Sequence, residues 1–218
     1  MYKLYIFDLD GTLLNTASGI IDACNYAAIQ IGWNPLSPSD FSGVIGTPVL
    51  SIFHQYYGMD LATAEQGVKI FRKEYARTGV YNACVYPGIT DLLSRLKTVD
   101  CKLAVATMKP VDSAETMLLH FNLRSYFDLV LGKGDNGDIS KANMIESCLS
   151  RYNITPQEAV FIGDSPQDQQ GAEIVKVNFI GVSYGLGFAN SLEIKKGYHT
   201  KVAESVCSLS ETLLNSIA

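Results

Sequence analysis

The chain has 218 residues, of which 47% are hydrophobic and 18% are charged, with a formal net charge of −5, as expected for a globular protein with a full core. The net negative charge argues against nucleic acid or a membrane as the main partner. No apolar run has the length of a membrane span. The acids at positions 8 and 10 argue against a signal peptide. Five scattered cysteines without a Cys-x-x-Cys pair indicate reduced thiols, so we expect a cytoplasmic protein with neither disulfides nor a zinc site.

The first predicted element is a buried strand over residues 3–8, where an apolar and aromatic run leads into the turn Asp8-Leu9-Asp10-Gly11. Side chains alternate along a strand, so Asp8 and Asp10 share one side of the chain. Open α/β sheets bind ligands at the carboxyl ends of their strands. Two acids held side by side are costly unless a cation or a shared proton relieves them, which makes this turn the first candidate site.

Helical patterns fill the next stretch of the chain, up to residue 86. Helices are predicted over residues 16–31 and 61–77, because each aligns apolar residues on one face and ends at a glycine. Short turn-rich pieces connect them, and no strand is predicted within residues 16–86. We therefore predict that residues 16–86 form an all-helical domain inserted into a core made of residues 1–15 and 87–218.

Strands alternate with helices from residue 87 onward. Strands are predicted at 101–107, 127–131, 159–164 and 178–182, and helices at 89–97, 111–121, 141–152, 167–176 and 203–217. The Gly-rich segment 184–187 is predicted to be a loop. This alternation implies right-handed crossovers and a parallel sheet covered on both faces. The predicted fold class is therefore α/β, a doubly wound, Rossmann-like parallel sheet with an inserted helical domain.

Polar side chains stand where three of the predicted strands end. Asp8 and Asp10 follow the first strand, and Thr107 and Asp164 end two later ones. Lys141 opens the helix before the Asp164 strand, so we expect it at the same edge of the sheet. Carboxylate oxygens suit Mg²⁺, whereas a hydroxyl and a lysine suit phosphate oxygens. The sequence therefore predicts a site for a metal and a phosphate at this edge.

These residues resemble the motifs of the haloacid dehalogenase-like superfamily of phosphotransferases, and the resemblance covers nearly the whole chain. The four motifs are matched, in order, by Asp8-Leu9-Asp10-Gly11-Thr12-Leu13, Thr107, Lys141 and Gly163-Asp164-Ser165-Pro166-Gln167-Asp168. The helical insert after the first motif is similar to the family's type 1 cap. The first and fourth motifs are specific, and the other two mean little alone.

Two further segments, 46–48 and 85–89, resemble the phosphoglycolate phosphatase-like branch of the family. The third motif departs from the family pattern, because the proline that often follows its lysine is missing after Lys141. Lys109 and Lys133 are therefore rivals for the role of that lysine. Lys141 is the preferred candidate, because it lies at a helix start shortly before the strand of the fourth motif.

The resemblance implies phosphoryl transfer through Asp8, which would attack phosphorus and become an aspartyl phosphate. Asp10 would protonate the leaving oxygen and then deprotonate the attacking water. The Thr107 hydroxyl and the backbone amide of Met108 would hold phosphoryl oxygens. Lys141 would offset the charge on Asp8 and on the phosphoryl group.

The same resemblance implies a bound Mg²⁺ as cofactor. Its ligands would be Asp8, Asp164 and, through its backbone carbonyl, Asp10. Asp168 would act from behind these ligands, orienting Lys141 or a metal-bound water.

For the substrate, the resemblance implies a small phosphate monoester. Phosphoglycolate is the first candidate, and nucleoside monophosphates, pyrophosphate and sugar phosphates stay open. A phosphomutase of the same fold is the alternative, and it would return the phosphoryl group to a sugar instead of releasing phosphate. A phospho-accepting signalling module also combines Asp pairs, a Thr and a Lys on a parallel sheet, but it is shorter and lacks a helical insert. A dehalogenase is disfavoured because Asp10 supplies an acid/base. We expect a monomer or a homodimer.

Overall fold

The computed structural model describes residues 1–41, 44–134 and 140–215. Contacts within the chain divide it into two compact units. One unit joins Met1–Asn15 to Val85–Ala218, and the other is Thr16–Cys84. Among the described residues, none of the helices is both long enough and apolar enough to cross a membrane.

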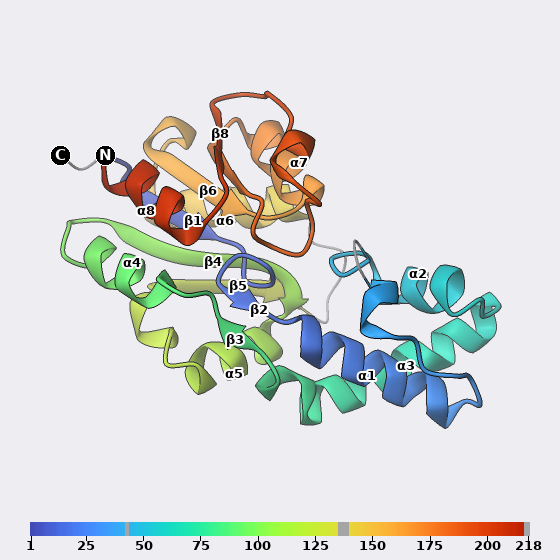
Figure 1. Ribbon diagram of the computed structural model, residues 1–218. Coiled ribbons are helices and arrows are strands. Elements are labelled where there is room, and N and C mark those ends of the chain that lie inside the picture. The colour runs from blue at the N-terminus through green and yellow to red at the C-terminus, as the bar shows by residue number, and fades with distance from the viewer. Residues whose placement is uncertain (42–43, 135–139, 216–218) are drawn as a thin grey trace. The chain divides into compact units, whose positions relative to one another are not determined.

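A six-stranded sheet forms the centre of the first unit, and all its neighbouring strands are parallel (Figure 1). Its spatial order is β5 (Leu129–Lys133), β4 (Lys102–Pro110), β1 (Leu4–Phe7), β6 (Ala159–Gly163), β7 (Asn178–Val182) and β8 (Thr200–Ala203). In β1, Leu4 is paired with Lys102 on one side and with Ala159 on the other. All four residues of β1 are buried, as expected for a central strand of a parallel sheet. The predicted α/β fold class is confirmed.

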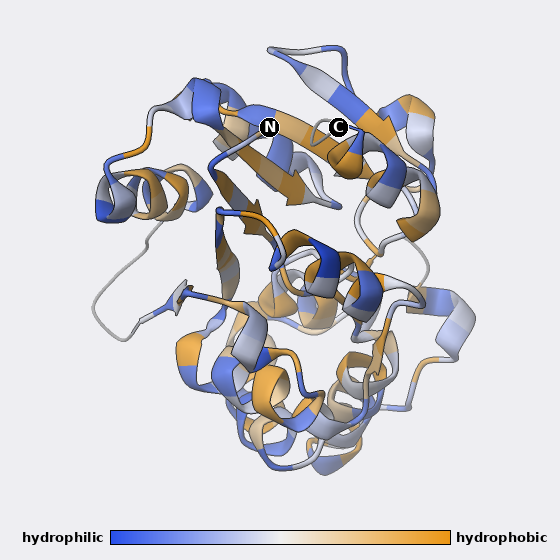
Figure 2. Ribbon diagram, turned by 90° about the vertical axis from the view of Figure 1, so that its left-hand side faces the viewer, coloured by the Kyte–Doolittle hydropathy of each residue, from blue (hydrophilic) through white to orange (hydrophobic). Residues whose placement is uncertain are grey.

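Helices cover this sheet, and their apolar faces complete its core. They are α4 (Ile89–Leu96), α5 (Val111–His120), α6 (Lys141–Tyr152), α7 (Pro166–Val175) and α8 (Val206–Leu214). Helix α6 packs against α7, and α4 packs against α8. Figure 2 shows the central strands coloured as hydrophobic, whereas the surrounding helices alternate hydrophobic and hydrophilic residues. Short 3₁₀ helices occupy three of the connections: η4 (Arg124–Tyr126), η5 (Pro156–Glu158) and η6 (Ser191–Glu193).

The second unit contains two long helices, α1 (Ala17–Gln30) and α3 (Leu61–Arg77), which pack against each other. The Asp60 side chain begins α3 by accepting a hydrogen bond from the Thr63 amide. Shorter elements complete the unit: η1 (Pro38–Phe41), α2 (Val49–Ser51), the π-helix η2 (Ile52–Tyr56) and η3 (Gly79–Tyr81).

Three short strands were not predicted. Strand β2 (Leu14–Asn15) pairs with β3 (Cys84–Val85). Strand β3 lies within residues 16–86, so the expectation of no strand in that span is wrong. Two-residue strands are too short for an alternating pattern to appear. A helix was predicted over residues 203–217, but β8 ends at Ala203 and α8 begins only at Val206. Ile217 lies outside the described residues.

Candidate active site

The two acids of the first turn follow the central strand β1, but their surroundings differ. The Asp8 amide continues the sheet by donating to the Ile162 carbonyl at 2.8 Å, and the Asp8 side chain is buried. The chain then reverses over Gly11, whose φ of +77° favours glycine. The Asp10 side chain is more open, with 27% of its surface exposed. Only Asp8 therefore lies in a buried position from which its charge must be balanced by neighbours.

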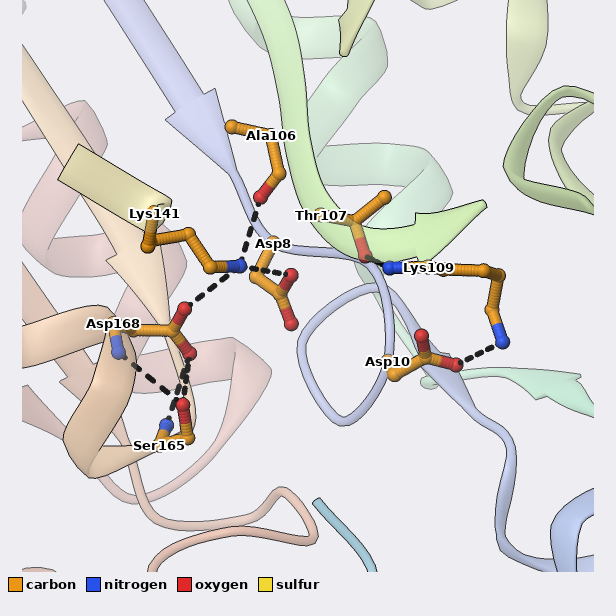
Figure 3. A network of polar contacts seen from close by, with 8 residues as sticks. All are labelled: Asp8, Asp10, Ala106, Thr107, Lys109, Lys141, Ser165 and Asp168. Atoms are coloured by element: carbon orange, nitrogen blue, oxygen red, sulfur yellow. Dashed lines mark hydrogen bonds and ion pairs between the residues drawn. The ribbon is translucent and has the colours of Figure 1, made fainter. Parts of the chain in front are cut away.

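Lys141 is the neighbour that balances it. Its ammonium group lies 2.7 Å from Asp8 Oδ1 and 2.9 Å from Asp168 Oδ1, and it donates to the Ala106 carbonyl at 3.0 Å (Figure 3). Helix α6 positions this lysine, because Ser140 caps the helix and Lys141 is its first residue. Of the two rivals, Lys109 is paired with Asp10 instead, at 3.1 Å. The geometry therefore places Lys141 beside Asp8, as preferred from the sequence.

Asp168 is held from the other side by the start of helix α7. Its Oδ2 accepts hydrogen bonds from the Ser165 amide at 3.1 Å and from the Ser165 hydroxyl at 2.7 Å. Ser165 in turn caps the helix by accepting from the Asp168 amide. One oxygen of Asp168 thus completes a capping box while the other pairs with Lys141. Both oxygens of Asp168 therefore have protein partners, Lys141 on one and Ser165 on the other.

Asp164 follows β6, and its side chain is hydrogen-bonded to the loop after β7. Its Oδ2 accepts from the amides of Leu186 and Gly187, at 2.7 and 2.9 Å. The carboxylate also packs onto Gly11, where an added Cβ would lie 1.9 Å from the same oxygen. The glycine of the first motif therefore leaves the space that Asp164 fills.

Thr107 is buried near the end of β4, beside a local irregularity in its pairing with β5. Its hydroxyl accepts a hydrogen bond from the Lys109 amide at 3.2 Å. The next residue, Met108, is 37% exposed. This bulged end of the strand lies beside Asp8 and Asp10 in Figure 3. A hydroxyl and backbone amides near the carboxyl end of a parallel strand can bind the oxygens of an anion.

Burial shapes the charges of the site. Burial raises the pKa of Asp8 to about 7, against the lowering effect of Lys141, with Asp168 and Asp10 adding to the rise. Burial also raises the pKa of Asp164, helped by the nearby Asp168 and Asp8. For Lys141, burial lowers the pKa, but Asp168 and Asp8 outweigh it and leave the pKa raised. Asp8 and Asp168 share one lysine and Asp164 lies near both acids, so the three carboxylates carry an excess of negative charge when all are ionised.

A divalent cation would remove this excess. Asp8, Asp164 and Asp168 can each bring one carboxylate oxygen within 4.8 Å of the others. Among the described residues, Lys141 lies on Asp8 Oδ1 and two amides lie on Asp164 Oδ2, so Asp8 Oδ2 and Asp164 Oδ1 are the oxygens open to a substrate or a cation. An all-oxygen donor set of this kind fits Mg²⁺.

Two contacts of the site were not foreseen. The segment 184–187 was predicted only to be a loop, and Lys109 only to be a rival of Lys141. The glycines of that loop were a visible signal of close backbone approach, but they did not indicate which residue is approached. Lys109 had no signal of its own, since a lysine two residues after a strand end is usually a surface residue.

Comparison with known proteins agrees with this picture. A family model described as haloacid dehalogenase-like hydrolase matches residues 5–182. A 5'-nucleotidase of Pseudomonas aeruginosa is 32% identical over 91% of this chain and 90% of its own. A phosphoglycolate phosphatase of Chromobacterium violaceum is 29% identical over 87% of this chain and 89% of its own. The solved structure of protein tyrosine kinase A (PtkA) from Mycobacterium tuberculosis superposes with a TM-score of 0.81, at 27% identity, over 97% of this chain and 98% of that one.

Proposed function

The chain belongs to the haloacid dehalogenase-like hydrolases, in their phosphoglycolate phosphatase-like branch, and from this premise we propose that it hydrolyses a small phosphate monoester with Mg²⁺ through an aspartyl phosphate. The resemblance drawn from the sequence is thus confirmed, and the enzyme class is that of the phosphoric monoester hydrolases. The observation that carries the finer proposal is the buried contact of Asp8 with Lys141, which is itself held by Asp168.

In this proposal Asp8 is the nucleophile. Its Oδ1 is held by Lys141, so Oδ2 would attack phosphorus and the ester oxygen would leave. The lysine lowers the pKa of Asp8 against the effect of burial, and it would offset the charge that the phosphoryl group brings. Water then attacks the aspartyl phosphate, which releases inorganic phosphate and restores the Asp8 carboxylate.

Asp10 would carry the protons of both steps. It would protonate the leaving oxygen in the first step and take a proton from the attacking water in the second. Its partial exposure and its ion pair with Lys109 leave its carboxylate near the surface of the site, where an ester oxygen can reach it. Thr107 and the Met108 amide, in the last part of β4, would hold phosphoryl oxygens.

Mg²⁺, when bound, would neutralise the charge of the phosphoryl oxygens and orient them for in-line attack. Asp8, Asp164 and the backbone carbonyl of Asp10 would hold it. Asp168 would not be a ligand in this proposal, because both of its oxygens already serve Lys141 and Ser165.

We further propose that residues 16–86 act as a cap domain that selects the substrate and excludes bulk water. Phosphoglycolate is the first candidate substrate, and a nucleoside monophosphate is the next, in view of the nucleotidase relative. The cytoplasmic location and the monomeric or dimeric state stay predictions.

The test is a phosphate-release screen of the purified protein with Mg²⁺ over small phosphate esters, including phosphoglycolate, nucleoside monophosphates, sugar phosphates and pyrophosphate. Release that needs Asp8, shown with Asp8→Asn as control, supports the proposal. Return of the phosphoryl group to a sugar would indicate a mutase. The likeness to PtkA favours a second candidate, phosphoryl transfer to tyrosine, so ATP with a tyrosine peptide belongs in the screen.

A further inference from the structure

The loop Tyr184–Gly187 makes contacts with Asp164 that have no role in the proposed reaction. Three successive backbone amides, from Leu186 to Phe188, all point at one residue, Asp164. Leu186 and Gly187 donate to the side-chain Oδ2 at 2.7 and 2.9 Å, and Phe188 donates to the backbone carbonyl at 2.8 Å. Two backbone amides of the loop therefore donate to the same carboxylate oxygen of Asp164.

Glycines make this approach possible. A Cβ added at Gly185 would lie 2.4 Å from Asp164 Cβ, 2.5 Å from the Gly11 carbonyl and 2.6 Å from Asp164 Oδ2. A side chain there would have to displace the loop, the turn after β1 or the carboxylate. The backbone of Gly185 is therefore wedged between the two metal-binding turns of the proposed site.

At the other end of the loop, Tyr184 contacts Thr12 and Tyr86. Its hydroxyl donates to the Thr12 carbonyl at 3.0 Å, and its ring meets the Tyr86 ring edge-on at 4.9 Å between centroids. The loop is thus tied to the turn that carries Asp10 as well as to Asp164. Asp164 therefore cannot rotate without breaking both amide contacts at once.

We propose that the loop Tyr184–Gly187 limits Asp164 to binding a metal through one oxygen and thereby makes the site select Mg²⁺ over Ca²⁺. The inference rests on the proposed Mg²⁺ site and concerns its selectivity. With Oδ2 accepting from two amides, Oδ1 is the oxygen left for the cation. Mg²⁺ takes six ligands in a nearly ideal octahedron and binds each carboxylate through one oxygen. Ca²⁺ takes up to eight ligands and often binds both oxygens of one carboxylate.

The first test is Gly185→Ala, with metal binding measured by calorimetry on the metal-free protein, using Mg²⁺ alone and Ca²⁺ alone. Displacing the loop frees Asp164 Oδ2, so Mg²⁺ affinity should fall by roughly 10-fold or more, the usual loss when a partner of a metal ligand is removed. Ca²⁺ affinity should fall less or rise, because the second oxygen becomes available. The preference for Mg²⁺ over Ca²⁺ should therefore fall about 10-fold.

Gly197→Ala is the matched control, because a Cβ there would meet nothing closer than the Thr200 hydroxyl at 3.3 Å. It should keep both affinities. If Gly185→Ala does not fold, Tyr184→Phe removes only the hydroxyl contact with Thr12 and should shift the preference in the same direction by a smaller factor. Its control is Tyr126→Phe, whose hydroxyl contacts Ser94.

Equal losses of Mg²⁺ and Ca²⁺ affinity in folded Gly185→Ala, or an unchanged preference in both variants, would overturn the inference. A wild-type protein that binds Mg²⁺ but releases no phosphate would contradict the proposed function and leave this inference standing. A wild-type protein that binds no Mg²⁺ would overturn both.

Discussion

The ammonium group of Lys109 lies 3.1 Å from Asp10 Oδ1, so each acid of the first turn has a lysine of its own. Asp8 faces Lys141 from the far part of the chain, while Lys109 comes from the strand end that carries Thr107. The Lys109 side chain is only 7% exposed, against 27% for Asp10. A substitution at Lys109 therefore tests the proposed acid/base role of Asp10 without changing Asp10 itself.

Lys109→Met should lower kcat by about 10-fold for an alkyl phosphate, because Asp10 would lose the contact that orients it toward the leaving oxygen. An aryl phosphate should be affected less, because its leaving group needs little protonation. Steady-state kinetics with both esters measures this. Lys102→Met is the control, since Lys102 meets Asp128 on the surface at 3.8 Å. A change in KM alone would show that Lys109 binds substrate instead.

Asp10→Asn should lower the steady-state rate by roughly 10²–10⁴-fold, the usual contribution of a general acid/base, while the fold and the backbone carbonyl stay. With p-nitrophenyl phosphate, Asp8 can still be phosphorylated while water attack is impaired. A phosphate adduct should therefore accumulate, to be detected by acid quench and intact mass. Asp8→Asn should show neither turnover nor adduct. Near wild-type turnover without an adduct would remove Asp10 from the mechanism.

Lys141→Met should abolish turnover and lower the free energy of unfolding by about 3 kcal/mol in a chelator, because it leaves Asp8 and Asp168 buried without their cation. Urea unfolding at pH 8 measures the change in stability. Lys133→Met, at the other rival lysine, should change stability by less than about 1 kcal/mol and keep activity. The reverse result would transfer the role to Lys133.

Activity should require Mg²⁺, disappear in a chelator and be suppressed by Ca²⁺. The larger ion takes more ligands and would draw both oxygens of Asp8 into binding, so that no oxygen is left to attack phosphorus. Phosphate release with each metal in turn, after dialysis against EDTA, measures this. Full turnover in EDTA, or equal turnover with Ca²⁺, would contradict the proposed site.

Glu158 provides a pH test away from the site. Hydrogen bonds from Lys3 and Thr155 lower the pKa of this carboxyl to about 2. A lowered pKa stabilises the folded state above the unfolded value near 4.5, and this contribution is lost as the pH falls toward 2. Carbon-detected NMR titration should find a midpoint near 2, and Lys3→Met should raise it toward 4.5. High salt should also raise it, since the pair is exposed.

Much of the site could be predicted because it stands at strand ends. Asp8 and Asp164 follow apolar runs, and parallel strands bring such ends to one edge of the sheet. Lys141 could be placed from its position at a helix start. The role of the loop Tyr184–Gly187 could not, because backbone amides leave no mark in the sequence beyond the glycines that let them approach.

The missed strands have a similar physical explanation. Strand β8 lies at the sheet edge, and its Lys201 and Val202 are exposed, so its sequence lacks the apolar run of the central strands. Strands β2 and β3 have two residues each, and their pairing depends on where the chain folds back rather than on any local pattern. Local sequence therefore predicts the buried centre of the sheet better than its margins.

The central place of β1 has a consequence for synthesis. This strand leaves the ribosome before both of its partners, residues 102–105 and 159–162. At ordinary translation speeds β1 waits on the order of ten seconds for its second partner, with both edges and an apolar surface unpaired. We therefore expect the nascent chain to depend on chaperones, and the proposed metal site to form only when most of the chain has been made.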